Sequence, residues 1–88
     1  MSIEGNKALA RRYYEEVVNT GKVELTGQFI SPEYTEVMDG TRYPVGIEGA
    51  KDHVTGVRQT YPDLHITIER QIAEGEWVVS CITARGTH

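Results

Sequence analysis

The histidine at position 88 is the side chain best suited to acid–base chemistry, because an imidazole gains and loses a proton near neutral pH. It ends a segment rich in valine, isoleucine and threonine that begins at Trp77 and is typical of a strand. Side chains alternate between the two faces of a strand, so His88 shares a face with small or apolar residues suited to a pocket floor. These residues are Val78, Ser80, Ile82, Ala84 and Gly86. The alternative is that His88 is a frayed terminal residue without a role.

A second candidate catalytic residue is Glu36, in a short predicted strand over residues 33–38. A carboxylate buried in a cavity loses hydration, which raises its pKa and makes it a general base. Tyr34 and Met38 share its strand face, and we expect both to contact a substrate. The alternative is that Glu36 is a solvated carboxylate on the strand surface.

Arg85 is a candidate substrate-binding residue on the opposite face of the last strand. A guanidinium group holds a carboxylate or an enolate through paired hydrogen bonds. The alternative is an ion pair with a carboxylate of a helix or of a partner chain. The same face carries Trp77, Val79, Cys81 and Thr83.

The aromatic residues and the cysteine have structural interpretations. We expect Tyr13, Tyr14 and Tyr61 to pack in the core, since aromatic side chains at helical spacing usually do so. Trp77 is interpreted as a packing residue or an interface anchor. Cys81, in the middle of a strand, is interpreted as a small buried hydrophobe.

The spacing of the remaining histidines argues against a metal site. His53 follows Asp52 on a predicted helix and is expected to be solvent-exposed, and His65 is placed on the polar face of a strand. Three dispersed histidines and one cysteine match no zinc spacing, and the sequence contains no glycine-rich phosphate loop. We therefore expect no cofactor and no metal.

The hydrophobic periodicity predicts helices first and strands later, which indicates the α+β class. A helix is predicted over 6–19, with Asn6 as its cap and Gly21 at its left-handed end, followed by a short helical segment over 22–30. The predicted elements that follow are a strand over 33–38 closed by the turn Asp39-Gly40, a loop over 42–46, a helix over 47–61, a strand over 64–69, a turn over 73–76 and a strand over 77–88.

Length and charge limit the classes of function. With 88 residues, 39% of them hydrophobic, the chain is predicted to form one domain over residues 1–88. Its net charge is -4, and its nine basic residues are dispersed, so nucleic-acid binding is not expected. No apolar stretch approaches the roughly 20 residues of a membrane span, and a lone cysteine suits a reducing cytosol. We expect a cytoplasmic protein without a membrane partner.

The last predicted strand has an edge that nothing later in the sequence pairs. An unpaired strand edge invites association with another chain. This feature predicts that the domain is incomplete or that a partner chain completes it.

Four segments in order along the chain together carry a family resemblance. They are Pro32-Glu33-Tyr34 at the first strand, Gly46-Ile47-Glu48-Gly49 at the second helix, Tyr61-Pro62-Asp63-Leu64 before the hairpin, and Ala84-Arg85-Gly86-Thr87-His88 at its end. In these segments the chain resembles SnoaL-like polyketide cyclases, or ester cyclases, of the nuclear transport factor 2-like superfamily. The resemblance implies an α+β cone, in which N-terminal helices pack on a curved antiparallel sheet.

The resemblance also implies chemistry, with departures from the family's pattern. It aligns His88 with a histidine that points into the cone, and it implies intramolecular aldol ring closure through an enolate. The characterised cyclases carry their acid/base aspartate in later strands, which this sequence lacks. Their first strand often ends in a histidine followed by Asp or Asn, where this chain has Glu36-Val37-Met38.

Two functional hypotheses follow. The first is a cofactor-independent cyclase, isomerase or lyase that acts by acid–base chemistry on a polyketide-like or other small carbonyl compound. The second is a non-catalytic half-cone that forms a homodimer and serves as a ligand-binding or interaction module. Both hypotheses include a small apolar or carbonyl-containing ligand and a homodimer.

Overall fold

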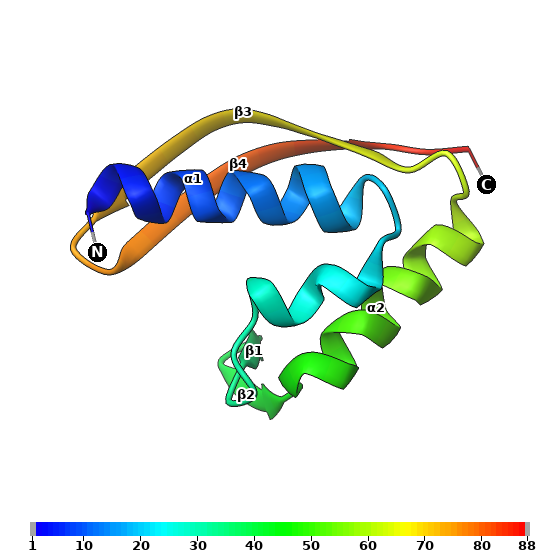
Figure 1. The fold of residues 1–88 in the computed structure, drawn as a ribbon, viewed down its shortest axis with the longest axis horizontal. Coiled ribbons are helices and arrows are strands. Elements are labelled where there is room, and N and C mark those ends of the chain that lie inside the picture. The colour runs from blue at the N-terminus through cyan, green and yellow to red at the C-terminus, as the bar shows by residue number, and fades with distance from the viewer. Residues whose placement is uncertain (1, 88) are drawn as a thin grey trace.

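The chain folds into helices and two β-hairpins, an α+β arrangement as predicted (Figure 1). The computed structural model describes residues 2–87. The elements in chain order are α1 (Ile3–Tyr13), the π-helix η1 (Tyr14–Val18), the 3₁₀ helix η2 (Val23–Gln28), β1 (Thr35–Met38), β2 (Thr41–Pro44), α2 (Gly46–Thr60), β3 (His65–Glu74) and β4 (Trp77–Arg85).

The first helix begins earlier than the sequence predicts. Ser2 is its N-cap, and the Ser2 hydroxyl accepts a hydrogen bond of 2.9 Å from the Gly5 amide. The prediction that Asn6 caps the helix is therefore wrong, since Asn6 lies inside it. The predicted end is confirmed, because Gly21 adopts a left-handed φ of 76°.

The β1–β2 hairpin is closed by the predicted turn. Asp39 and Gly40 both have positive φ, 52° and 77°, as a tight hairpin turn with the twist of its strands requires. The loop predicted over 42–46 is wrong, because its first part forms strand β2. Thr35 of β1 pairs with Pro44 at the end of β2, a strand end where a missing amide donor is tolerated.

A bulge divides the longer hairpin, β3–β4. The pairing register shifts between Ile68 and Arg70, so the face of β3 that points inward changes there. Ile66 and Ile68 are shielded from solvent before the bulge, whereas Gln71 and Ala73 are shielded after it. Strand β3 is longer than the predicted 64–69. The alternation of apolar and polar side chains is interrupted at the bulge, so the sequence pattern does not show that the strand continues.

Helix α1 and its continuation η1 lie along one face of the β3–β4 hairpin, whereas η2 and α2 extend away from it (Figure 1). The core is small and consists of Val17, Ala50, Val54, Leu64 and Ile66. The expected single curved sheet is wrong for residues 2–87, because β1–β2 and β3–β4 are separate two-stranded sheets. The cavity described below lies between them.

The side chain of Asn19 joins the first helical segment to β3. Its Nδ2 donates to the Ile66 carbonyl at 2.9 Å, and its Oδ1 accepts from the Ile66 amide at 2.6 Å. The amide side chain thus makes the two hydrogen bonds to Ile66 that a residue of a neighbouring strand would make. This pair of hydrogen bonds fixes the start of β3 against the end of η1.

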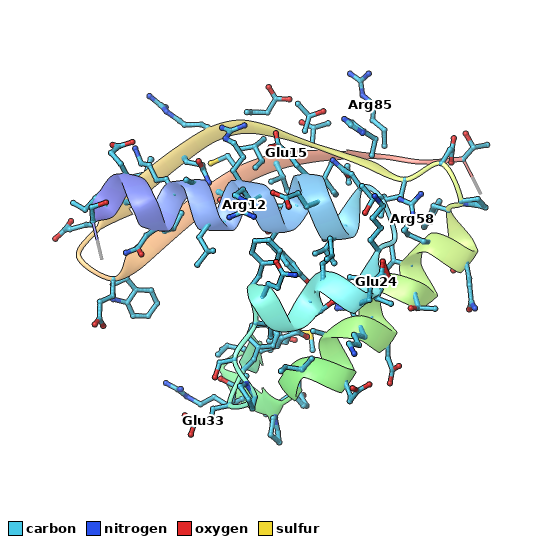
Figure 2. All side chains as sticks on the ribbon, viewed as in Figure 1. Arg12, Glu15, Glu24, Glu33, Arg58 and Arg85 are labelled. Atoms are coloured by element: carbon cyan, nitrogen blue, oxygen red, sulfur yellow. The ribbon has the colours of Figure 1, made fainter. Side chains whose placement is uncertain are left out.

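The guanidinium of Arg58 links α2 to the end of η1 and to the segment that leads into β3 (Figure 2). Nη1 donates to the carbonyls of Val18 at 3.2 Å and Leu64 at 3.0 Å, and Nη2 donates to the Pro62 carbonyl at 3.0 Å. Gly21 leaves room for this side chain, since a Cβ at that position would lie 3.1 Å from the Arg58 Nε. One cation therefore satisfies carbonyls from two separate segments of the chain.

No helix within residues 2–87 has the length and apolar character needed to cross a membrane.

Replacing Arg58 by methionine removes the guanidinium and keeps much of the stem. We expect the free energy of unfolding to fall by about 2–4 kcal/mol, because three carbonyls lose a charged donor. Urea titration followed by circular dichroism measures this change. Arg42→Met, at an exposed position of β2, is the matched control, and an equal loss in both variants would contradict the role given to Arg58.

Candidate functional site

A cavity of about 320 Å³ lies between α2, the β1 region and the inner face of the β3–β4 hairpin. This volume lies within the range of small-molecule sites. Most of its wall is aliphatic, and two side chains of the wall, Glu36 and His53, carry acid–base groups that serve at neutral pH. The other lining residues are Tyr13, Tyr14, Val18, Tyr34, Val54, Val57, Leu64, Ile66, Ile82 and Ala84.

Glu36 is the centre of the polar part of this cavity. The Tyr34 hydroxyl donates a hydrogen bond of 3.2 Å to Glu36 Oε2, and His53 Nδ1 lies 3.5 Å from the same oxygen. The Glu36 side chain is only 24% exposed, so it is not the fully solvated strand carboxylate of the alternative interpretation. A carboxylate held at an apolar cavity can accept a proton from a bound molecule.

The tyrosines around Glu36 remain neutral hydrogen-bond donors. Burial raises the pKa of Tyr34 to about 12, and the charge of Glu36 and the hydrogen bond to it act in the same direction. Burial also raises the pKa of Tyr13, with smaller contributions from Tyr14 and Glu36. A neutral phenol can donate to a developing oxyanion without itself supplying a charge.

A second cavity, of about 410 Å³, adjoins the first along α1. Tyr13, Tyr14 and Tyr34 line both cavities. The expectation that Tyr13 and Tyr14 pack in the core rather than in a pocket holds only in part, since their rings pack edge to face but both side chains are partly exposed and line the two cavities. Helical spacing shows that such residues face inward, but it does not show whether the interior is filled.

The predicted inner face of the last strand is confirmed as far as Ala84. Val78 and Ser80 line the second cavity, and Ile82 and Ala84 line the first. Gly86 instead packs on Tyr61, where a Cβ would come within 2.8 Å of the tyrosine Cβ. His88 lies outside the described residues, so its catalytic role stays a prediction.

The structure does not bring two of the predicted substrate-binding residues to the cavity. Arg85 is exposed and points away from the helices (Figure 2). Met38 lies at the end of β1 and is 55% exposed. Tyr34 and Glu36, by contrast, lie together in the cavity wall, as their shared strand face predicts.

The interpretation of Cys81 as a buried residue is wrong, because Cys81 is exposed on the outward face of β4. The expectation that His53 is exposed to solvent is confirmed, since 62% of its side chain is exposed, and His53 also lines the cavity beside Glu36. Its position three residues after buried Ala50 and one before buried Val54 was the available signal, since it borders the apolar stripe of α2.

Within residues 2–87, no group of three His, Cys, Asp or Glu side chains could hold a metal ion. The expectation that the protein uses neither metal nor cofactor stays a prediction.

Comparison with known proteins identifies the family. The sequence profile described as SnoaL-like polyketide cyclase matches residues 8–88. The chain belongs to the SnoaL-like polyketide cyclase family. No curated protein matches it in a sequence search.

Solved structures of two candidate polyketide cyclases share this family fold. The first, from Acidithiobacillus ferrooxidans, aligns with a TM-score of 0.84 at 28% identity over 100% of this chain. The second, IdmH from Streptomyces antibioticus, aligns with a TM-score of 0.78 at 22% identity over 94% of this chain. This chain spans 66% and 65% of their lengths, respectively.

Two of the segments that carry the SnoaL-like resemblance are in contact in the structure. The Thr87 amide donates a hydrogen bond of 2.7 Å to Asp63 Oδ1, beside the packing of Gly86 on Tyr61. The amide of Thr87 lowers the pKa of Asp63 below its ordinary value, and Arg58 adds a smaller effect. Asp63 thus holds the backbone at Thr87, two residues after the end of β4.

The contact with Thr87 predicts a dependence of stability on pH. Because the pKa of Asp63 is lower in the folded state, its stabilising effect is present above the unfolded value of 3.8 and is lost as the pH falls through the folded value. We expect wild type to exceed Asp63→Asn in unfolding free energy at about pH 6, and the difference to shrink below about pH 4.

Urea titrations at several pH values measure this difference. Asp52→Asn, on the exposed side of α2, is the matched control. A difference between wild type and Asp63→Asn that does not change with pH would show that the carboxylate charge plays no part.

Proposed function

We propose that this chain binds a small carbonyl compound in the cavity beside Glu36 and catalyses the transfer of a proton from the carbon next to the carbonyl. The proposal places the cavity inside the cone that the resemblance implies. It is supported chiefly by one observation, the Glu36 carboxylate held between the Tyr34 hydroxyl and the His53 ring in an apolar wall. Membership of the SnoaL-like polyketide cyclase family also supports the proposal. Proton transfer next to a carbonyl is a step that a cyclase, an isomerase or a lyase would share.

In the proposed mechanism, Glu36 acts as the general base. Its Oε2 takes the proton from carbon, and the electron pair of the broken C–H bond moves to the carbonyl oxygen and forms an enolate. Tyr34, already directed at Glu36, then has a neutral hydroxyl that can donate to the enolate oxygen. In a ring closure, the enolate carbon attacks a second carbonyl, and the new alkoxide takes a proton from a protonated acid, the role given below to His88, while the proton taken by Glu36 is released to solvent.

His88 keeps a place in this proposal as a second acid–base residue. It follows Thr87, which Asp63 fixes, and the strand that leads to it contributes Ile82 and Ala84 to the cavity wall. Arg85 lies on the outward face, so the mechanism gives it no step.

The proton-transfer proposal is tested with benzoylacetone, a 1,3-diketone, in deuterium oxide. We expect the wild-type chain to accelerate exchange of the methylene protons for deuterium, as followed by NMR. In Glu36→Gln we expect this exchange to fall by about a hundredfold or more, because an amide cannot accept the proton.

Glu33→Gln is the matched control, since Glu33 is exposed and points away from the β3–β4 hairpin (Figure 2). Exchange that persists in Glu36→Gln, or falls equally in Glu33→Gln, would contradict the role of Glu36.

A second candidate function, a dimeric interaction module, is favoured by an apolar patch on the outward face of β3–β4. Its members Ile72, Trp77 and Val79 are 54%, 80% and 56% exposed. Arg70 and Glu74 lie on either side of Ile72 along β3, so the patch carries both charge signs and suits a second copy of itself. We propose a homodimer through this patch, which is compatible with catalysis on the inner face.

Trp77→Ser tests the dimer. We expect wild type to be dimeric by native mass spectrometry and sedimentation, and Trp77→Ser to weaken the dimer by about 2 kcal/mol or more, because an aromatic anchor is lost. Val37→Ser, which removes a residue of 59% exposure on the other hairpin, should leave the dimer unchanged. A monomeric wild type would end the proposal.

A further inference from the structure

His53 lies where a proton could leave the cavity. Its Nδ1 is 3.5 Å from Glu36 Oε2, while 62% of its side chain is exposed to solvent. Glu36 is 24% exposed, and the same Oε2 accepts a hydrogen bond from the Tyr34 hydroxyl. The imidazole therefore lies against the partly buried carboxylate and is itself exposed to solvent.

A general base that removes a proton from carbon must release it before it can act again. Glu36 is only partly exposed, and the structure places two side chains, Tyr34 and His53, against its carboxylate. Tyr34 reaches it as a hydrogen-bond donor, and the pKa of this tyrosine, about 12, makes it a poor carrier of protons at neutral pH. The hairpin wall beside it is aliphatic, with Leu64, Ile66, Ile82 and Ala84.

We infer that His53 is a positioning residue that passes protons between Glu36 and solvent, an inference that rests on the proposed function. In this step protonated Glu36 gives its proton to Nδ1 of the neutral His53 ring, which becomes an imidazolium. The imidazolium releases a proton from Nε2 to water, and exchange with water restores the starting tautomer. One proton moves from the cavity to solvent, and no electrons are transferred.

The titratable groups that face Glu36 and His53 come from two parts of the fold. Tyr13 and Tyr14 belong to the α1–η1 segment, and Tyr34 precedes β1. The β3–β4 hairpin contributes no titratable side chain to the cavity wall, and α2 contributes His53 itself. No arginine or lysine is among the residues that line this cavity, so the imidazole is the nitrogen base available to the carboxylate in this part of the described chain.

The test uses the same exchange of benzoylacetone protons in deuterium oxide. In His53→Ala we expect kcat for exchange to fall by about tenfold with KM unchanged, because protonated Glu36 returns the original proton to the substrate. Free imidazole in the buffer should restore the rate, since the removed ring lay at an exposed position. His65→Ala, at an exposed position of β3, is the matched control.

The Glu36→Gln/His53→Ala double variant separates relay from direct catalysis by the buffer. Imidazole should not restore exchange there, because the group that feeds the relay is gone. Exchange that needs Glu36 but is unchanged in His53→Ala overturns this inference and leaves the proposed function standing. Rescue that is equal in the double variant also overturns it, and a wild type without exchange activity overturns both.

Discussion

The guanidinium of Arg58 fixes the point at which the helical segments meet the β3–β4 hairpin. It donates to the carbonyls of Val18, Pro62 and Leu64, and so it joins the end of η1, helix α2 and the start of β3. A chain of this length buries a smaller fraction of its surface than a larger domain does, and its apolar core has few members. Charge-assisted hydrogen bonds therefore set the angles between elements that a larger core would set by packing.

This arrangement determines where the site can form. Because Arg58 anchors the last turns of α2, the preceding turns of the same helix present Val54 and Val57 to the hairpin and His53 to β1. The β1–β2 hairpin has no backbone hydrogen bonds to β3–β4 within residues 2–87. The space between the two hairpins is consequently a cavity, and the carboxylate of Glu36 enters it.

The sequence predicts the features that local chemistry decides, and it does not predict the contacts between segments that are distant in the chain. The turn at Asp39-Gly40 and the left-handed Gly21 were predictable, because backbone conformations with positive φ demand particular residues. The bulge after Ile68 was not, since it depends on pairing with β4. Tyr34 and Glu36 could be grouped from strand alternation, whereas the approach of His53 required the packing of α2 against a segment far away in the chain.

The proposed roles of Glu36 and His88 are complementary rather than competing. Glu36 belongs to the wall formed by β1 and α2, while the strand that ends before His88 forms the facing wall through Ile82 and Ala84. Ring closure needs a base at the carbon that loses a proton and an acid at the oxygen that gains one. In the proposed function Glu36 takes the first of these roles and His88 the second, so the base belongs to the first strand and the acid to the chain that follows the last one.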